Sequence, residues 1–201
     1  MSEHAMSALA AGSSTGVAVP HGLWKPAVRA LQSADLACFG RHLQRLQGDC
    51  RRSRFGLAVS DTFLRDYAAR VDLANTAVLG CFADGDMRGV CEVRSLRSGW
   101  CAEAELAFTV EKAWRGRGIG TALMARAIRA ARDLGIEHLY LTCHPGNRGM
   151  QCIAAKFAAT MSYDDGECFA DISMHCQPMS ALLEPGEGGA PACSRMVVLD
   201  L

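Results

Sequence analysis

The 201-residue sequence predicts an α/β domain with a mixed, mostly antiparallel central sheet flanked by helices. Apolar residues first recur at helical spacing, over residues 33–48 and 60–72. The apolar period then changes to two over residues 76–96, which indicates a pair of strands. Strand-like and helix-like segments alternate after that, as in a strand–helix–strand unit with parallel strands and a right-handed crossover.

The segments before the first strand pair are two helices and their connections. Residues 1–26 are rich in alanine, glycine and serine without an apolar period, and we expect a flexible arm there. A helix is expected over 33–48, which begins with a capping serine and ends at a glycine. A short basic loop should follow over 49–56. The second helix, over 60–72, has Ser60 as its candidate N-cap.

The first two strands form a hairpin over 76–96, because an Asp-Gly pair at Asp84-Gly85 separates the two apolar runs. A third strand is expected over 101–110, and its side chains should alternate between two faces. One face carries Leu106, Phe108 and Val110, and the other carries Glu103, Glu105, Ala107 and Thr109.

The second half of the chain continues with helix and strand in turn. The clearest helix covers 119–135 and ends at a glycine. We expect a central strand over 136–143, a helix over 147–161 and a late strand over 166–174, followed by a loop-like tail at 177–201. The apolar face of the first of these helices consists of Ile119, Leu123, Ala127, Ala131 and Leu134.

Composition excludes several classes of function. Lysine plus arginine and aspartate plus glutamate both number 21, so the formal net charge is zero and neither nucleic acid nor an anionic membrane is an expected partner. No apolar run approaches the roughly 20 residues of a membrane span. The ten cysteines form no CxxC pair, which argues against structural zinc, and we expect no metal. Without a secretory pattern at the N-terminus, we expect a cytoplasmic protein with reduced thiols, among them Cys81, Cys91 and Cys152.

A glycine-rich turn precedes the helix at 119–135. It reads RGRGIG over residues 115–120, with glycines at 116, 118 and 120. The first N–H groups of a helix lack intrahelical partners and carry the positive end of its dipole, so such a turn can seat a phosphate. It is not a P-loop, which needs a lysine before Thr121, and it matches the dinucleotide fingerprint poorly. From the residues alone, a phosphate cradle and a purely structural turn remain equally open.

The stretch 115–120 is similar to the pattern Arg/Gln-x-x-Gly-x-Gly/Ala of the GNAT superfamily, N-acetyltransferases that use acetyl-coenzyme A. The segments AELAFTV before it and LYLTC and NRGMQCIAAKF after it resemble the cofactor-binding core of that superfamily in order and spacing. The likeness runs from about Arg29 to Met174, and the stretch SRFGLAVSDTFLRDYAARVD resembles the domains of bacterial protein-lysine acetyltransferases. The resemblance implies a GNAT domain over residues 27–176, whose sheet contains a splayed pair of parallel strands. It also implies a protein that is a monomer or a homodimer.

The resemblance also implies a cofactor site. The pyrophosphate of coenzyme A would contact the backbone of the turn, aided by arginine side chains, and the pantetheine arm would pair with the strand before it as an added strand. Asn147 aligns with an asparagine that often contacts the coenzyme, although an ordinary helix N-cap explains it as well. The implied cofactor-binding residues are Phe108, Thr109, Val110, Arg115, Gly116, Arg117, Gly118, Ile119, Gly120, Thr121 and Asn147.

Acetyl transfer needs a neutral amine, and a lysine-like amine is neutral in only roughly one molecule in a few thousand at pH 7. Glu105 matches the strand glutamate that acts as general base in some GNAT enzymes, and Glu103 on the same face is the runner-up. A polar position on a half-exposed strand is the alternative explanation for Glu105.

The chain departs from the GNAT pattern where many members carry a tyrosine that protonates the departing thiolate. Ala154 stands there, and Ala158-Ala159 replaces the usual Gly-aromatic pair. Tyr163 is a possible substitute for the acid. A nucleophilic Cys143-His144 pair is not expected, because neighbouring strand residues point to opposite faces. The leading function is an N-acetyltransferase acting on a protein lysine or a small amine, and the alternative is a non-catalytic acyl-CoA-binding domain. A module that binds a different phosphate ligand on a similar turn is a remote third.

Overall fold

The computed structural model describes residues 26–97, 99 and 102–176, so the predicted arm and tail lie outside the described residues apart from Pro26. Its centre is a seven-stranded sheet in the order β1-β2-β3-β4-β5-β7-β6. The strands are β1 Ala27–Ala30, β2 Thr76–Ala83, β3 Asp86–Ser95, β4 Glu103–Val110, β5 His138–Cys143, β6 Thr160–Asp164 and β7 Glu167–Ser173.

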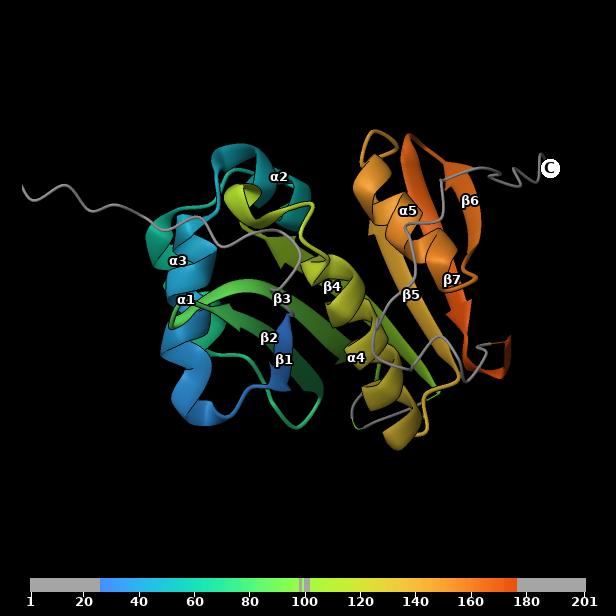
Figure 1. The fold of residues 1–201 in the computed structure, drawn as a ribbon, viewed down its shortest axis with the longest axis horizontal. Coiled ribbons are helices and arrows are strands. Elements are labelled where there is room, and N and C mark those ends of the chain that lie inside the picture. The colour runs from blue at the N-terminus through green and yellow to red at the C-terminus, as the bar shows by residue number, and fades with distance from the viewer. Residues whose placement is uncertain (1–25, 98, 100–101, 177–201) are drawn as a thin grey trace, which may run out of the picture.

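Strand pairing confirms the predicted mixed sheet. Neighbouring strands are antiparallel except β4 and β5, which pair in parallel around α4 Ile119–Asp133. That parallel pairing covers only Glu103–Glu105 against His138–Tyr140, at the beginning of both strands. In Figure 1 the ribbon accordingly divides into a β1–β4 part with the N-terminal helices and a β5–β7 part with α5.

Helices cover both faces of the sheet, and a separate apolar core lies under each set. The N-terminal helices pack on β2 and β3 through Phe39, Leu43 and Leu64, which are fully buried. On the other face, α4 and α5 pack over β2 to β7, and the predicted face of α4 is buried from Ile119 to Ala131. The helices are α1 Leu36–Arg45, α2 Gly48–Phe55, α3 Asp61–Ala69, α4 and α5 Arg148–Lys156.

The β2–β3 hairpin and the β6–β7 hairpin each turn on an Asp-Gly pair. Asp84 and Gly85 have φ of 51° and 77°, and Asp165 and Gly166 have 44° and 77°, as a two-residue type I′ turn requires. The first turn was predicted from the sequence. The second joins β6 to β7 and was not.

Two sequence predictions of elements were wrong, and one strand was missed. The expected basic loop at 49–56 is the helix α2, in which Phe55 packs edge-on against Phe63 and Tyr67 of α3. The helix expected over 147–161 ends at Lys156, and its last residues belong to β6. The edge strand β1 was missed because its side chains, mostly exposed, show no apolar period.

The described part of the chain contains no helix both long and apolar enough to cross a membrane. Cys81 and Cys91 are free and fully buried, as expected of small apolar side chains, and Cys152 is partly exposed.

Candidate active site

The parting of β4 and β5 leaves one edge of β4 without a strand beside it. After Glu105 the chain continues through Leu106 to Val110, still paired with β3 on its other edge. A small cavity lies against this stretch, lined by residues 105–110 of β4 and by Leu141, Thr142 and Cys143 of β5. The predicted splay is therefore present, and it opens the sheet beside the candidate base.

The glycine turn lies at the N-terminus of α4. Gly116 and Gly118 have φ of 74° and 82°, in the left-handed region that glycine adopts without strain. Gly118 is the N-cap residue, and Ala122 N donates to Gly118 O at 3.0 Å as the first turn begins. The preceding N–H groups have no carbonyl to reach within the helix, so the helix end can bind an anion.

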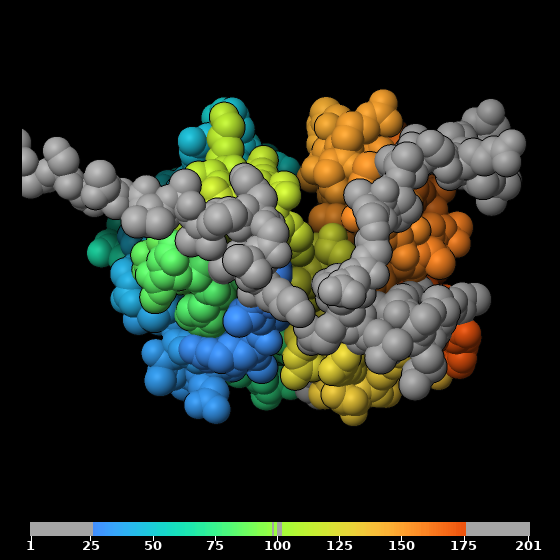
Figure 2. Space-filling model, viewed as in Figure 1, coloured from blue at the N-terminus to red at the C-terminus, as the bar shows by residue number. Residues whose placement is uncertain are grey.

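A larger cavity of about 850 Å³ lies over this turn, and Figure 2 shows the surface hollowed between the yellow-green turn and the orange α5. Lys156 and His144 add basic side chains to its wall. The two cavities share Cys50, Ser53, Phe108, Val110, Arg115, Asn147 and Met150, so they form one continuous cleft.

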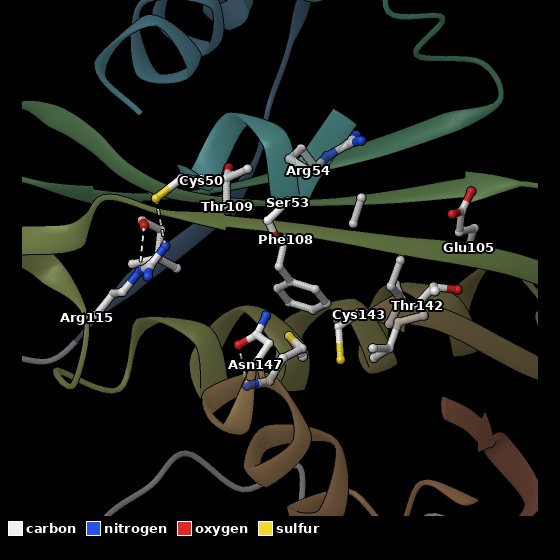
Figure 3. Close-up of a pocket in the computed structure, with 15 residues that line it drawn as sticks. Cys50, Ser53, Arg54, Glu105, Phe108, Thr109, Arg115, Thr142, Cys143 and Asn147 are labelled. Carbon is white, nitrogen blue, oxygen red and sulfur yellow. Dashed lines mark hydrogen bonds between the residues drawn. The ribbon is translucent and has the colours of Figure 1, made fainter. Parts of the chain in front are cut away.

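This cleft brings together almost all of the predicted site residues. Glu105 and Thr109 line the β4 end, the glycine turn lines the other end, and Figure 3 shows Phe108 between Glu105 and Arg115. Arg117 alone of the predicted set lines neither cavity; its guanidinium lies over the Trp114 ring, 4.6 Å from the centroid. Arg115 spans the cleft instead, donating to Val110 O at 3.3 Å and to Cys50 Sγ at 3.1 Å.

The candidate base Glu105 is exposed, at the end of the cleft away from the glycine turn. Glu103, on the same face, accepts a hydrogen bond from Tyr140 Oη at 3.2 Å. Asp171 of β7 contacts His138 Nδ1 at 3.0 Å, and β7 neighbours β5 at Tyr140. Of these three carboxylates, Glu105 alone lines the cleft.

Sequence reasoning missed the contribution of α2, which was expected to be a loop. Cys50, Ser53 and Arg54 of this helix line the small cavity opposite β5. Arg54 anchors α2 to the sheet through Glu92 of β3, whose side chain is 3% exposed, with Nη2 and Oε1 2.6 Å apart. The signal that could have revealed the helix is Gly56, which has a φ of 74° and ends α2.

The other predicted residues have definite places. Asn147 is the N-cap of α5, and its Oδ1 accepts a hydrogen bond from Met150 N at 3.2 Å, while the residue lines both cavities. Ala154 is fully buried in the core. Tyr163 is on β6 and donates to Gln151 Oε1 at 3.4 Å, and it lines neither cavity.

Cys143 reaches the cleft from β5, directly opposite Cys168 of β7. Burial, reinforced by the neighbouring Cys168 thiol, raises the pKa of Cys143 to about 12. Its thiol is therefore protonated at neutral pH, the opposite of what a nucleophile needs. His144 is occupied separately, with Nδ1 accepting from Gly146 N at 2.9 Å. Among the described residues, no group of three or more His, Cys, Asp or Glu side chains could hold a metal ion.

Comparison with known proteins identifies a family. The model of the family described as Acetyltransferase (GNAT) family matches residues 41–157, which is more than half of the chain. A search of curated protein sequences finds no match.

Solved structures share the fold at low sequence identity. The GNAT domain of S. lividans PAT superposes with a TM-score of 0.63 and 21% identity, covering 74% of this chain and 90% of that one. The yncA protein of Salmonella typhimurium, solved with its cofactor acetyl-CoA, has a TM-score of 0.57 and 17% identity, with 74% of this chain and 94% of that one covered. RimL, a ribosomal L7/L12 alpha-N-protein acetyltransferase in complex with coenzyme A, has a TM-score of 0.57 and 14% identity, with 73% and 93% covered.

Proposed function

Since the chain belongs to the GNAT family of acetyltransferases, we propose that it moves an acetyl group from acetyl-coenzyme A to a primary amine by direct transfer, with Glu105 as general base. The observation that carries the proposal is the continuous cleft that runs from the N-terminus of α4, past the splayed half of β4, to Glu105. The cleft joins an anion-binding helix end to a carboxylate through the gap in the sheet.

The glycine turn fits the pyrophosphate of the coenzyme. Backbone N–H groups from Arg117 to Thr121 supply donors, and the α4 dipole favours negative charge there. Ile119 contributes only backbone, since its side chain is buried in the core. Arg115 and Lys156 line the same cavity and supply positive charge.

The pantetheine arm fits the unpaired edge of β4. Phe108, Thr109 and Val110 line the cleft where β5 has parted, so an extended amide chain can add to the free edge of β4 there. Asn147 stands on the opposite wall with its Oδ1 engaged as a helix cap, which leaves its Nδ2 as a donor.

Glu105 removes the proton that an amine must lose to attack the thioester. The nitrogen then bonds to the carbonyl carbon as the carbon–sulfur bond breaks. A base within direct or one-water reach contributes typically 10²- to 10⁴-fold. The cleft lining includes no tyrosine among the described residues, so the coenzyme thiolate, a fair leaving group, takes its proton from water.

The acceptor is a primary amine, of a protein lysine or of a small molecule. Glu105 places a carboxylate at the outer end of the cleft, which favours a cationic acceptor by charge.

A non-catalytic acyl-CoA-binding domain is the second candidate, favoured by Ala154 at the position of the usual tyrosine. Measurement of thiol release from acetyl-CoA in the presence of a panel of amines and lysine peptides distinguishes the enzyme from the binding domain. Transfer to an amine, reduced by roughly 10²-fold or more in Glu105→Gln, supports the enzyme. Calorimetric binding of coenzyme A without any transfer supports the binding domain, and an unaltered rate in Glu105→Gln rejects the base.

A further inference from the structure

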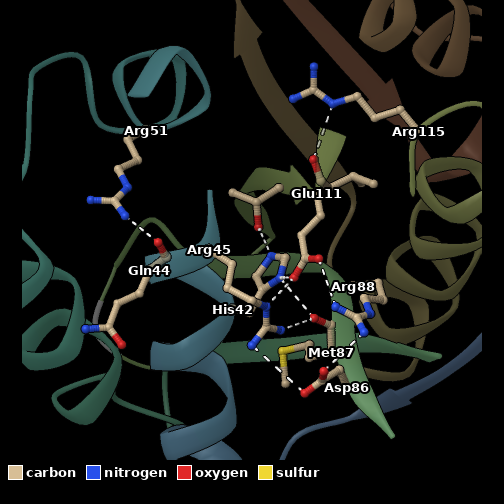
Figure 4. A network of polar contacts seen from close by, with 11 residues as sticks. His42, Gln44, Arg45, Arg51, Asp86, Met87, Arg88, Glu111 and Arg115 are labelled. Carbon is tan, nitrogen blue, oxygen red and sulfur yellow. Dashed lines mark hydrogen bonds and ion pairs between the residues drawn. The ribbon is translucent and has the colours of Figure 1, made fainter. Parts of the chain in front are cut away.

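A polar network on the α1 side of the sheet holds the splayed half of β4 in place. We call this the β4 network; Figure 4 shows it, and its members are His42 and Arg45 of α1, Arg88 of β3, Thr109 of β4 and Glu111 just beyond β4. Because β5 pairs with β4 only as far as Glu105, the last residues of β4 rely on β3 and on these side chains for their position.

His42 is the centre of the network and is fully buried. Its Nδ1 lies 3.2 Å from Met87 O and 3.3 Å from Glu111 Oε1, and its Nε2 lies 2.9 Å from Thr109 Oγ1. Both groups that face Nδ1 are acceptors, so Nδ1 carries a hydrogen and donates. The Thr109 hydroxyl, which can donate or accept, satisfies the other nitrogen. Each ring nitrogen is therefore committed to a residue on the β3–β4 side.

Glu111 connects the network to the glycine turn. Its Oε1 accepts from Arg45 Nε at 2.8 Å, and its Oε2 accepts from Arg88 Nη1 at 3.1 Å. Arg88 in turn lies over the Trp114 ring, 5.1 Å from the centroid, and the guanidinium of Arg117 lies 4.6 Å from the same ring. Trp114 lines the larger cavity, so the contacts run from α1 to the wall of the cleft.

Burial of these polar groups does not give the largest free energy of folding that a contact between a helix and a sheet can provide. A buried histidine and ion pair stabilise a fold no better than apolar side chains of similar volume, while they fix one relative geometry. The rest of the contact between α1 and the sheet is apolar, through residues such as Phe39 and Leu43. The polar contacts of α1 reach Thr109 and Glu111, at the end of β4 that borders the cleft, and also Met87 and Asp86 beside them on β3.

We propose that His42 and Glu111 are positioning residues for coenzyme A. His42 holds the end of β4 through Thr109, and Glu111 holds the turn after β4 through Arg88, each in the geometry that the coenzyme needs. The inference rests on the proposed function, because it assumes that the pantetheine arm adds to this edge of β4. Neither side chain lines the cleft, so each acts through the residue it holds.

The test compares Thr109→Val, which removes the hydroxyl at nearly constant volume, with Thr109→Ser, which keeps it. Ser95→Ala is the matched control, because it removes another largely buried hydroxyl bond, Ser95 Oγ to Gly99 O at 2.6 Å, at the opposite end of the same strand pair. Coenzyme A affinity is measured by calorimetry and stability by urea unfolding. We expect Thr109→Val to raise the Kd for coenzyme A roughly five- to tenfold, Thr109→Ser to raise it less than Thr109→Val does, and Ser95→Ala to leave it unchanged.

His42→Leu and the double variant His42→Leu/Thr109→Val complete a cycle. If His42 acts through Thr109, the double variant raises the Kd no further than the larger single effect. A wild-type Kd in Thr109→Val, together with a loss of stability like that of Ser95→Ala, would show a purely structural network and overturn the inference. Absence of coenzyme A binding by the wild-type protein would instead overturn the proposed function itself.

Discussion

Ala158 occupies at the end of α5 the same left-handed position that Gly135 occupies at the end of α4. The φ angles are 53° for Ala158 and 72° for Gly135. In both helix ends the next residue donates back five positions, Ala159 N to Ala154 O at 3.2 Å and Ile136 N to Ala131 O at 2.9 Å. This is the hydrogen bond of a Schellman motif, in which glycine is the usual residue at the left-handed position.

We therefore expect Ala158→Gly to stabilise the protein. An alanine in the left-handed region costs roughly 1 kcal/mol relative to an unstrained conformation, and glycine adopts that region freely. Part of the gain is offset by the extra freedom of glycine in the unfolded chain. Urea unfolding should show an increase of up to about 1 kcal/mol. Ala155→Gly, inside α5, is the control and should lower stability by a similar amount; a loss in both variants would contradict the helix-end geometry.

Gly118→Ala should weaken coenzyme A binding, whereas Gly135→Ala should not. Both glycines have positive φ, at 82° and 72°, at opposite ends of α4, so alanine should cost each variant about 1 kcal/mol of stability. Only Gly118 belongs to the cleft, at the N-cap where the helix presents its free N–H groups. Relaxation of the strain there moves these donors, and we expect a Kd about tenfold higher. Equal affinities of the two variants for coenzyme A would show that the glycine turn is not part of the coenzyme-binding site.

The sequence was most informative where one local pattern determines one structure. The apolar face of 119–135 was predicted correctly. In β4, Leu106, Phe108 and Val110 pack in one core as their predicted common face requires, although Thr109 on the other face is buried as well. The glycine turn and Glu105 were found because their spacing resembles a family pattern, and they line one cleft. The strand β6 was missed although Asp165-Gly166 signals its hairpin, because an apolar helical period continues across Ala158.

What the sequence did not predict depends on contacts between distant segments. The fixed geometry of His42 arises from residues 45 to 69 positions away in the chain, and no local pattern marks it. The helix α2 carries too few apolar residues for a helical period, and it is held by Arg54 against Glu92 and by Phe55 against Tyr67. Both features belong to tertiary packing, which local propensity does not encode.

Cys143→Ala should leave the acetyl-transfer rate close to that of the wild type. Burial and the adjacent Cys168 thiol raise the pKa of Cys143 to about 12, so the thiolate needed for a covalent acetyl-cysteine step is scarce at neutral pH. Removal of a true nucleophile costs at least roughly 10⁴-fold in kcat. Steady-state kinetics distinguish the two outcomes, and Cys168→Ala controls for altered packing between β5 and β7. A loss of that size in Cys143→Ala alone would replace direct transfer with a covalent mechanism.

Acid should destabilise the protein in part through Glu111. Partial burial opposes ionisation of this carboxylate, but hydrogen bonds from His42, Arg45 and Arg88 prevail and lower its pKa from 4.5 to about 2. A carboxylate with a lowered folded-state pKa stabilises the fold above pH 4.5, and that contribution is lost as the pH falls from 4.5 through 2. The wild type should therefore exceed Glu111→Gln in unfolding free energy at pH 6, by a margin that shrinks by up to about 3 kcal/mol near pH 2. Urea unfolding of both proteins at a series of pH values measures this margin, and a margin independent of pH would mean that Glu111 is not held as an ionised group.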